Sequence, residues 1–248
     1  MSSEEEGLQM NPAKDQPLLK MVVIGASGAS GREVVRNAAI DPAVGAIKII
    51  TRRILPEWES DPVISKKISI MKLDDYDNLI SLQTELSSGH FDVFFCCLGT
   101  TQKQGKETFI KVDYTYCLRS AELAHQCQIP HFSVVSSGGT NPDSMFFYLK
   151  TKGEMERDIK KIGFEYCSVA KPGMLRNREN DSRCGEKFFC CFACCAPNIE
   201  IKTLGAALVI DAVRYWQLGR GAEGGKLNRG NVDLSNQGLK DIVKNYGG

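Results

Sequence analysis

The sequence predicts an α/β fold, with a doubly wound parallel sheet covered by helices on both faces. Two observations support this prediction. Short apolar runs alternate with helix-like segments before residue 171, and a glycine-rich turn follows the first of these runs. Alternating strands and helices imply parallel pairing with right-handed crossovers. The chain has 248 residues, enough for one such domain with a full core.

The expected strands are six runs rich in aliphatic and aromatic residues. In chain order they are MVVIGA, AIKIIT, KISIMK, FDVFFCCLG, HFSVVSS and FEYCSVA. Helical patterns lie between them. The segment GREVVRNAAI places Val34, Val35 and Ala38 on one face, and residues 109–127 carry apolar side chains at a spacing near 3.6.

The chain divides into a tail and one domain. Residues 1–19 are polar and include two prolines, so we expect a disordered N-terminal tail. We expect residues 20–248 to form a single domain, in which the chain after about Lys171 adds a cap or pocket wall. No internal repeat or low-complexity linker suggests a second domain.

Composition limits the classes of function. Lys plus Arg number 31 and Asp plus Glu 30, with no long basic stripe, so we expect no direct nucleic-acid binding. No apolar run reaches the roughly 20 residues of a membrane span. The acidic start MSSEEEGLQM is unlike a secretory leader, so the ten cysteines indicate thiols in a reducing compartment. We therefore expect a cytoplasmic protein.

Three glycines, Gly25, Gly28 and Gly31, stand between the first expected strand and helix. This context is typical of a dinucleotide phosphate site. The turn needs unusual dihedral angles, the backbone must approach a pyrophosphate closely, and the helix directs its N–H groups at that anion. We expect these glycines, with Ser27, to bind the cofactor. The alternative is a tight turn without a ligand.

The end of the second expected strand indicates which dinucleotide binds. NAD sites usually have an acidic residue there, which binds the ribose hydroxyls. This chain has Thr51, Arg52 and Arg53 instead. Arginine can hold a 2′-phosphate through charge-assisted hydrogen bonds. We therefore predict NADPH rather than NADH, with Arg52 and Arg53 at the cofactor. The alternative is that both arginines are solvated loop residues.

The fourth expected strand ends in Leu98, Gly99 and Thr100, which we also assign to the cofactor. They should lie at the carboxyl edge of the sheet, where ligands bind in open α/β folds. The preceding Cys96 and Cys97 belong to the strand, and we interpret them as core residues.

A candidate active site follows the fifth expected strand. Tyr148 and Lys152 form a Y-x-x-x-K pair, and this spacing places both side chains on one face of a helix. A neighbouring ammonium group stabilises a phenolate, so such a tyrosine can exchange a proton with a carbonyl or alcohol oxygen. A serine hydroxyl can hold the same oxygen. Ser136 and Ser137 alternate faces at the strand end, and we select Ser137. The alternative is a surface helix with a chance Tyr–Lys pair.

Five motifs occur in the chain in the order GASGASG, FCCLGTT, SVVSSGG, YLKTKGEME and VAKPGML. With these motifs the chain resembles an atypical short-chain dehydrogenase/reductase, most of all the Tat-interacting oxidoreductase family. The resemblance covers about residues 20–245. The resemblance implies a Rossmann fold with bound NADPH. It implies that Ser137, Tyr148 and Lys152 are catalytic and that Lys152 also holds the nicotinamide ribose. Pro172, in the KPG segment, would pack beside the nicotinamide carboxamide. The chain departs from the pattern at Asp113, where many such enzymes carry an asparagine of the proton relay.

The resemblance implies two functions. The first is an NADPH-dependent reductase with an unidentified carbonyl substrate. The second is an NADPH-binding regulatory protein that acts through protein partners, such as nuclear import receptors, in nuclear import, transcription or apoptosis. The retained Ser–Tyr–Lys set favours the enzyme. We expect a monomer or weak dimer, with the nucleus as a second location beside the cytoplasm.

Four cysteines, Cys190, Cys191, Cys194 and Cys195, form a cluster near the C-terminal third. Zinc usually takes two separated pairs of ligands, so we predict no metal site and interpret these residues as buried or neutral thiols. Acylation and metal binding are the alternatives. The three histidines of the chain are scattered, and we interpret them as structural or solvated.

Overall fold

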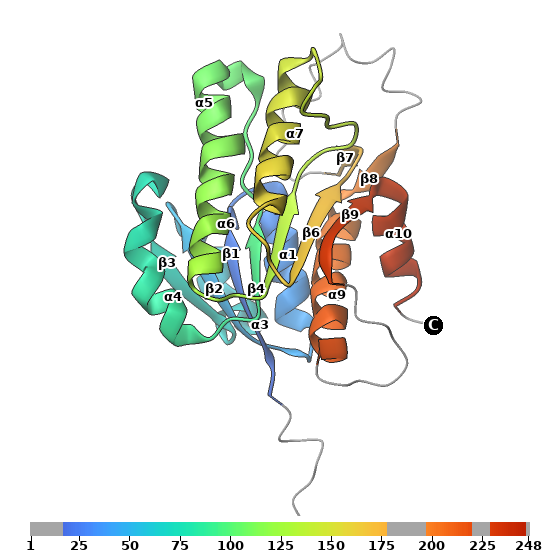
Figure 1. Cartoon of the computed structure of the whole chain (residues 1–248). Coiled ribbons are helices and arrows are strands. Elements are labelled where there is room, and N and C mark those ends of the chain that lie inside the picture. The colour runs from blue at the N-terminus through green and yellow to red at the C-terminus, as the bar shows by residue number, and fades with distance from the viewer. Residues whose placement is uncertain (1–16, 178–196, 220–228, 247–248) are drawn as a thin grey trace, which may run out of the picture.

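The computed structural model describes residues 17–177, 197–219 and 229–246. A seven-stranded sheet lies at its centre, in the order β3-β2-β1-β4-β5-β6-β9 (Figure 1). Every neighbouring pair is parallel. The strands are β1 (Leu19–Ile24), β2 (Val44–Thr51), β3 (Ile68–Lys72), β4 (Val93–Cys96), β5 (His131–Val135), β6 (Tyr166–Lys171) and β9 (Gly230–Ser235). This is the Rossmann-type, doubly wound sheet that the sequence predicts.

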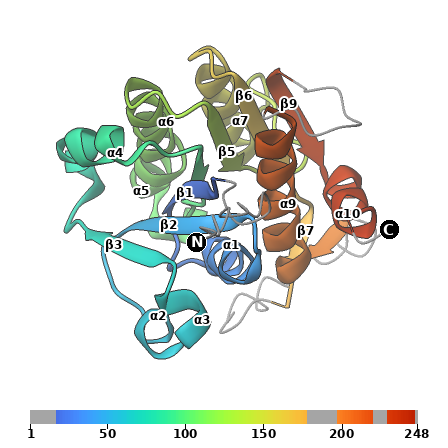
Figure 2. The same ribbon diagram turned by 90° about the horizontal axis from the view of Figure 1, so that it is seen from below.

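Helices cover both faces of the sheet, as the view from below shows (Figure 2). On one face lie α1 (Ala29–Ile40), α2 (Glu57–Ser60), α3 (Pro62–Ser65), α9 (Ile201–Gly219) and α10 (Asn236–Lys244). On the other lie η1 (Tyr76–Leu82), α4 (Gln83–Gly89), α5 (Lys106–Ile110), η3 (Lys111–Tyr116), α6 (Cys117–Gln126) and α7 (Phe147–Lys160). The 3₁₀ turn η2 (Gln102–Gln104) and a separate parallel pair, β7 (Met174–Arg176) with β8 (Asn198–Glu200), complete the described elements.

The apolar periodicity of the sequence accounts for the packing of these layers. Val34, Val35 and Ala38 are fully buried on the inner face of α1, as their spacing predicts. The inner strands β1, β4, β5 and β6 are buried on both faces, so they read as nearly continuous apolar runs rather than as alternating ones. Each layer of helices therefore encloses its own hydrophobic cluster against the sheet.

Three parts of the chain differ in detail from the prediction. The expected helix over residues 109–127 is interrupted by a π-helical segment at Lys111–Tyr116. The residues after Lys171 do more than line a pocket, because α9 packs on α1 and β9 adds a seventh strand to the sheet. At the N-terminus, β1 begins at Leu19, which the prediction places in the tail; residues 1–16 are outside the described residues.

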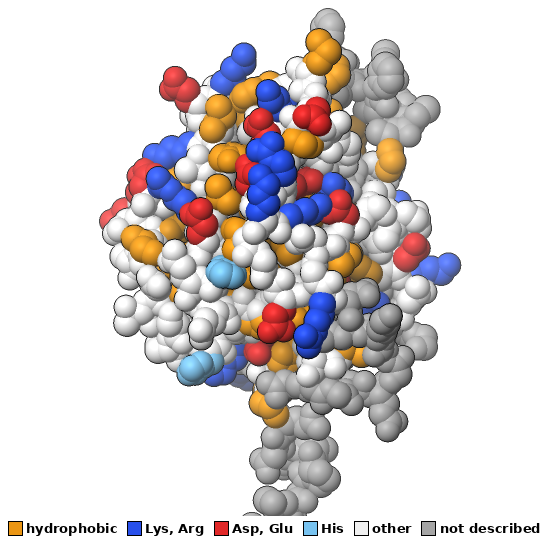
Figure 3. All heavy atoms as spheres, in the orientation of Figure 1, with side chains coloured by type: hydrophobic (Ala, Val, Ile, Leu, Met, Phe, Trp, Pro, Cys, Tyr) orange, Lys and Arg blue, Asp and Glu red, His pale blue; other side chains and the backbone are white. Residues whose placement is uncertain are grey.

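Charged side chains of both signs are interspersed over the face formed by α5, α6 and α7 (Figure 3). Several form ion pairs, such as Arg119 with Asp77 and Arg157 with Asp158. Across the described ranges, no helix has the length and apolar character needed to cross a membrane.

Candidate functional site

The carboxyl ends of the parallel strands meet at one edge of the sheet, at the top in Figure 1. The glycine turn follows β1 at this edge. Gly25 has a φ of +80°, and a Cβ added to it would lie 2.6 Å from the backbone carbon of Cys97. A Cβ on Gly31 would lie 2.7 Å from the Cα of Ala26. The protein itself therefore requires glycine at both positions.

Gly28 is different. It is exposed, and an added Cβ would approach only the carbonyl oxygen of Gly25, at 3.3 Å. Gly28 is also the N-cap of α1, which has no capping side chain and no acidic residue in its first turn. The N-terminal N–H groups and the positive end of the helix dipole are thus available to an anion. The half-buried Ser27 lies in the same turn. These features fit a dinucleotide pyrophosphate.

The end of β2 presents two arginines at the same edge. Arg52 and Arg53 are both exposed, and the Arg52 guanidinium lies 5.1 Å from the centre of the Tyr76 ring. The hydroxyl of Thr51 donates to the Arg53 carbonyl at 2.7 Å and accepts from the Arg53 N–H at 3.2 Å. The turn is therefore fixed, and Arg52 is ordered by stacking on Tyr76.

The turn after β4 is joined to the interior through Asp113. The backbone N–H of Thr100 donates to Asp113 Oδ2 at 2.7 Å, and Lys152 Nζ lies 2.9 Å from Asp113 Oδ1. Next to it, Leu98 is buried and Gly99 is exposed. Because Asp113 occupies the Thr100 N–H, a cofactor would have to use other atoms of this turn.

The Lys152–Asp113 ion pair is almost completely buried, with 5% of Lys152 and none of Asp113 exposed. Burial alone would lower the pKa of Lys152. The carboxylate of Asp113, together with Tyr148 and Cys117, outweighs that effect, and the pKa of Lys152 is raised. The side chain of Lys152 therefore remains a cation at neutral pH.

Tyr148 and Lys152 lie on one face of α7, as their spacing predicts. The ammonium of Lys152 is 6.0 Å from the centre of the Tyr148 ring. The ring of Phe109 packs against Tyr148 at a centroid distance of 5.4 Å. Tyr148 is half-buried, so its ring is supported on one side and reachable from solvent on the other.

The two candidate serines have different surroundings. Ser136 is buried and donates its hydroxyl hydrogen bond to Glu156 Oε1. Ser137 is half-exposed, and its Oγ lies 3.5 Å from the carbonyl oxygen of Gly138. The hydroxyl that can reach a ligand is therefore that of Ser137. The assignment of Ser137 to the chemistry stays a prediction.

Pro172 is buried at the end of β6, where its carbonyl oxygen accepts from the Gly138 N–H at 2.7 Å. This bond joins the loop after β5 to the loop after β6. The predicted site residues thus occupy the ends of β1, β2, β4, β5 and β6, and α7, at one edge of the sheet.

Two contributors were not among the predicted site residues. Asp113 was noted only as a departure from the family pattern, whereas the structure makes it the partner of Lys152. Glu156 is buried beneath the loop that carries Ser137. A sequence signal for Glu156 does exist, because it follows Lys152 by four residues and so occupies the same helix face.

The cysteine cluster at residues 190–195 lies outside the described residues. The cysteines that the structure describes are unpaired, and burial raises the pKa of Cys97 to about 12. Among the described side chains, no three His, Cys, Asp or Glu residues gather as metal ligands would. His131 is buried, and burial lowers its pKa to about 3, so it is neutral.

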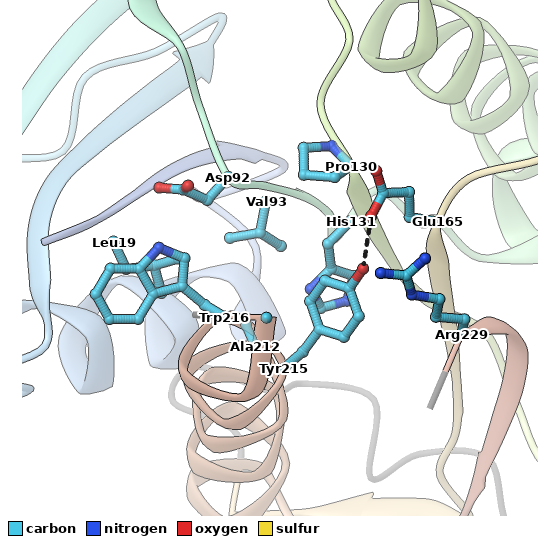
Figure 4. A pocket seen from close by; sticks show the side chains of 11 residues that line it. Leu19, Asp92, Val93, Pro130, His131, Glu165, Ala212, Tyr215, Trp216 and Arg229 are labelled. Carbon is cyan, nitrogen blue, oxygen red and sulfur yellow. Dashed lines mark hydrogen bonds between the residues drawn. The ribbon is translucent and has the colours of Figure 1, made fainter. Parts of the chain in front are cut away.

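A pocket of about 220 Å³ lies at the opposite edge of the sheet, where the strands begin (Figure 4). Its walls include Trp216 and Tyr215 from α9 and His131 from the start of β5. Tyr215 donates a hydrogen bond to Glu165 across it. None of the predicted cofactor or catalytic residues lines this pocket.

Comparison with known proteins agrees with this fold. No protein-family profile matches the chain. Protein HTATIP2 of Rattus norvegicus is 34% identical over 196 residues, which make up 76% of this chain and 78% of the relative. The Candida albicans protein named "Protein FMP52, mitochondrial" is 34% identical over 162 residues, 64% of this chain and 69% of the relative.

Several solved structures share this fold. A UDP-glucose-4-epimerase from Stenotrophomonas maltophila with bound NAD has a TM-score of 0.65 at 10% identity, covering 88% of this chain and 77% of the other. MoeE5 in complex with UDP-glucose and NAD has a TM-score of 0.60 at 14% identity, over 92% and 82%. A short-chain dehydrogenase from Streptomyces avermitilis has a TM-score of 0.59 at 15% identity, over 93% and 92%.

Proposed function

The chain belongs to the HTATIP2 family, and we propose that it is an NADPH-dependent oxidoreductase of the short-chain dehydrogenase/reductase type that acts on a carbonyl substrate. The observation that carries this proposal is the placement of Tyr148 over a buried Lys152–Asp113 ion pair, at the sheet edge that also holds the glycine turn. A surface helix with a chance Tyr–Lys pair would have no reason to bury the lysine with a carboxylate.

The proposed cofactor would be held at three places. The glycine turn and the start of α1 would bind the pyrophosphate, and Arg52 with Arg53 would bind the 2′-phosphate. At the other end, Lys152 would hold the nicotinamide ribose and Pro172 would pack beside the carboxamide. Bound there, NADPH would supply the hydride.

The protein residues would handle the proton. The phenol of Tyr148 would donate it to the carbonyl oxygen of the substrate, and the hydroxyl of Ser137 would hold the same oxygen by a hydrogen bond. Lys152 would stabilise the phenolate that remains, because its pKa is raised and its ammonium keeps its charge. Asp113 would keep that ammonium in place without contacting substrate.

A regulatory protein that binds NADPH and acts through partners, such as nuclear import receptors, is the second candidate. The buried Lys152–Asp113 pair is compatible with this second function, because a rigid lysine can also hold a cofactor ribose without taking part in catalysis. The two functions differ in one result. A regulator would bind NADPH and change its affinity for a partner, yet turn over no member of a carbonyl panel.

The cellular location belongs to the proposal as well. We propose the cytoplasm and nucleus, whereas the names of the fungal relatives place those proteins in mitochondria. Imaging of the full chain with a C-terminal fluorescent tag, which leaves the N-terminus unmodified, distinguishes these compartments. Signal confined to mitochondria would contradict the proposed location.

The choice of cofactor tests the proposal directly. We expect NADPH to bind more tightly than NADH in calorimetry. Arg52→Asp should abolish or invert the preference, because it replaces a cation at the 2′-phosphate with an anion. Lys66→Asp, an equal change of charge at the exposed C-cap of α3, is the control and should keep the preference. Equal affinities of the unmodified protein for NADPH and NADH would contradict NADPH specificity.

A further inference from the structure

A buried carboxylate lies beneath the loop that carries Ser137. Glu156 is 4% exposed. Its Oε1 accepts hydrogen bonds from the hydroxyls of Ser136 and Thr140, the latter at 2.6 Å. Its Oε2 lies 2.9 Å from Lys171 Nζ. Lys171 also pairs with Asp233 of β9 at 2.9 Å. The loop after β5 and the end of β6 thus meet at one side chain of α7, and β9 joins the network through Lys171.

A buried carboxylate costs free energy unless hydrogen bonds and an opposite charge satisfy it. Here the two oxygens of Glu156 are satisfied by two hydroxyls and an ammonium. Burial alone would lower the pKa of Lys171, but its hydrogen bonds to Glu156 and Asp233 raise it, so it keeps its charge. A network satisfied in this way is rigid, because each member has one low-energy arrangement.

The hydrogen-bonded network of Glu156 contains the sequence neighbours of two predicted site residues, Ser137 and Pro172. Ser137 lies between Ser136 and Thr140, both of which are bound to Glu156. Pro172 follows Lys171 directly, and its carbonyl oxygen is bound to the Gly138 N–H. Glu156 itself is on α7, one turn after Lys152. The Ser137 loop and the Pro172 loop are thus joined to each other by backbone hydrogen bonds, and Glu156 connects both of them to the helix of Tyr148.

We propose that Glu156 is a positioning residue that holds the loops carrying Ser137 and Pro172 against α7, at the nicotinamide end of the cofactor site. This inference rests on the proposed cofactor. Glu156 does not act on substrate, because it is buried and both of its oxygens are occupied. Its removal should disturb the nicotinamide end and leave the adenosine end unchanged, since the glycine turn and Arg52 make no contact with the network.

Two ligands distinguish an effect at the nicotinamide end of the proposed cofactor site from an effect at its adenosine end. In calorimetry, Glu156→Gln should weaken NADPH binding by roughly tenfold, the equivalent of one lost charge-assisted hydrogen bond. The affinity for adenosine 2′,5′-bisphosphate, which lacks the nicotinamide half, should be unchanged. Glu154→Gln is the matched control, because Glu154 lies on the same helix, about a third exposed, and pairs only loosely with Lys150. A Glu156→Gln variant that keeps the wild-type affinity for both ligands would overturn the proposal.

A second measurement requires no ligand. Amide hydrogen exchange should accelerate in the segments 136–140 and 171–173 of Glu156→Gln, and not in 25–31. Lys171 keeps Asp233 as a partner in this variant, so we expect it to fold. If it does not, Ser136→Ala with Thr140→Val removes the two hydroxyls instead and should show the same pattern. Unchanged exchange would overturn the proposal, whereas faster exchange in a protein that binds no NADPH would contradict only the proposed cofactor.

Discussion

Lys152 and Asp113 form the buried ion pair on which the proposed chemistry depends. The pair gives Lys152 a fixed position under the ring of Tyr148, and Asp113 also accepts the Thr100 N–H. Removal of either partner would leave a buried charge uncompensated, a change that typically costs about 3–5 kcal/mol of folding free energy. Substitutions at Tyr148 are therefore cleaner probes of the chemistry than substitutions at Lys152.

Tyr148→Phe removes only the phenolic oxygen, so the packing against Phe109 should hardly change. If Tyr148 is the proton donor, reductase turnover should fall by about 10²–10⁴-fold, the usual contribution of a general acid or base. NADPH affinity should hold. Tyr114→Phe, on the neighbouring π-helical segment, is the control and should retain turnover. Turnover at the wild-type rate in Tyr148→Phe would show that the Y-x-x-x-K assignment is wrong.

His131 offers a test of stability that is independent of the active site. Its pKa is lowered by burial to about 3, whereas an unfolded histidine titrates near 6.5. Between these values the unfolded state binds one more proton, so the free energy of unfolding should rise with pH by up to about 1.4 kcal/mol per unit and level off above pH 6.5. Half-buried Asp211, whose pKa is raised by desolvation to about 6, has the opposite sign.

The variant His131→Phe isolates the histidine, because phenylalanine can keep the ring contacts with Tyr166 and Tyr215. Urea unfolding at several pH values between 4 and 7 should give a shallower rise of stability with pH than the protein that keeps His131 shows. Both proteins carry Asp211→Asn in this comparison, because Asp211 and His131 share the Ser168 hydroxyl and the pKa of Asp211 would otherwise differ between them. Identical slopes would mean that folding does not lower the pKa of His131.

The turn between β1 and α1 must pack closely against other protein atoms and also leave the N-terminus of α1 accessible. Gly25 and Gly31 are required by the close approach of protein atoms, and Gly28 is open to solvent at the helix N-terminus. A second irregular element is the π-helical segment η3. It places Asp113 in the interior, where the carboxylate accepts a hydrogen bond from the Thr100 N–H in the turn after β4. Such π-bulges occur often at functional sites.

Two alanine variants separate the demands of the glycine turn. Gly28→Ala should fold, since its backbone φ of −82° suits any residue, and should lose most of its NADPH affinity because the methyl group takes the place of the pyrophosphate. Gly31→Ala should instead lower the melting temperature, because its methyl group collides with the backbone of the turn. Circular dichroism and calorimetry measure the two effects. Full NADPH affinity in a folded Gly28→Ala would mean that the turn holds no phosphate.

The complete fold depends on the C-terminal part of the chain. The strand β9 pairs along β6, and Asp233 in it binds both Lys160 and Lys171. The helix α10 packs on α9, with Leu239 fully buried. The residues after Lys171 are therefore part of the core as well as candidates for a pocket wall.

A chain that ends at Gly219 should fail to reach the native state. It would expose the edge of β6, remove the buried Leu239 and leave Lys160 and Lys171 without Asp233. Thermal scans by circular dichroism should show no cooperative transition, in contrast to a chain that ends at Tyr246. A cooperative transition in the shorter chain would show that β9 and α10 are dispensable additions.

The local patterns of the sequence were sufficient for six of the seven strands of the sheet, the glycine turn and the placement of Tyr148 and Lys152 on one helix face. Each depends on neighbours in sequence: strand runs are contiguous, and residues four apart share a helix face. The arginines after β2 could likewise be located at the ligand edge, because every parallel strand ends there. Their role toward a 2′-phosphate stays a prediction.

Tertiary structure alone decided the partners of the buried charges. Asp113 meets Lys152, and Glu156 meets Lys171, only because the parallel topology brings the ends of separate strands and helices to one edge. The strand β9 was not predicted, since GNVDLS is short, polar and half-exposed at the rim of the sheet and so lacks a distinct pattern. Periodicity reports which face of an element is buried, but the choice of partner across the core is made by the fold.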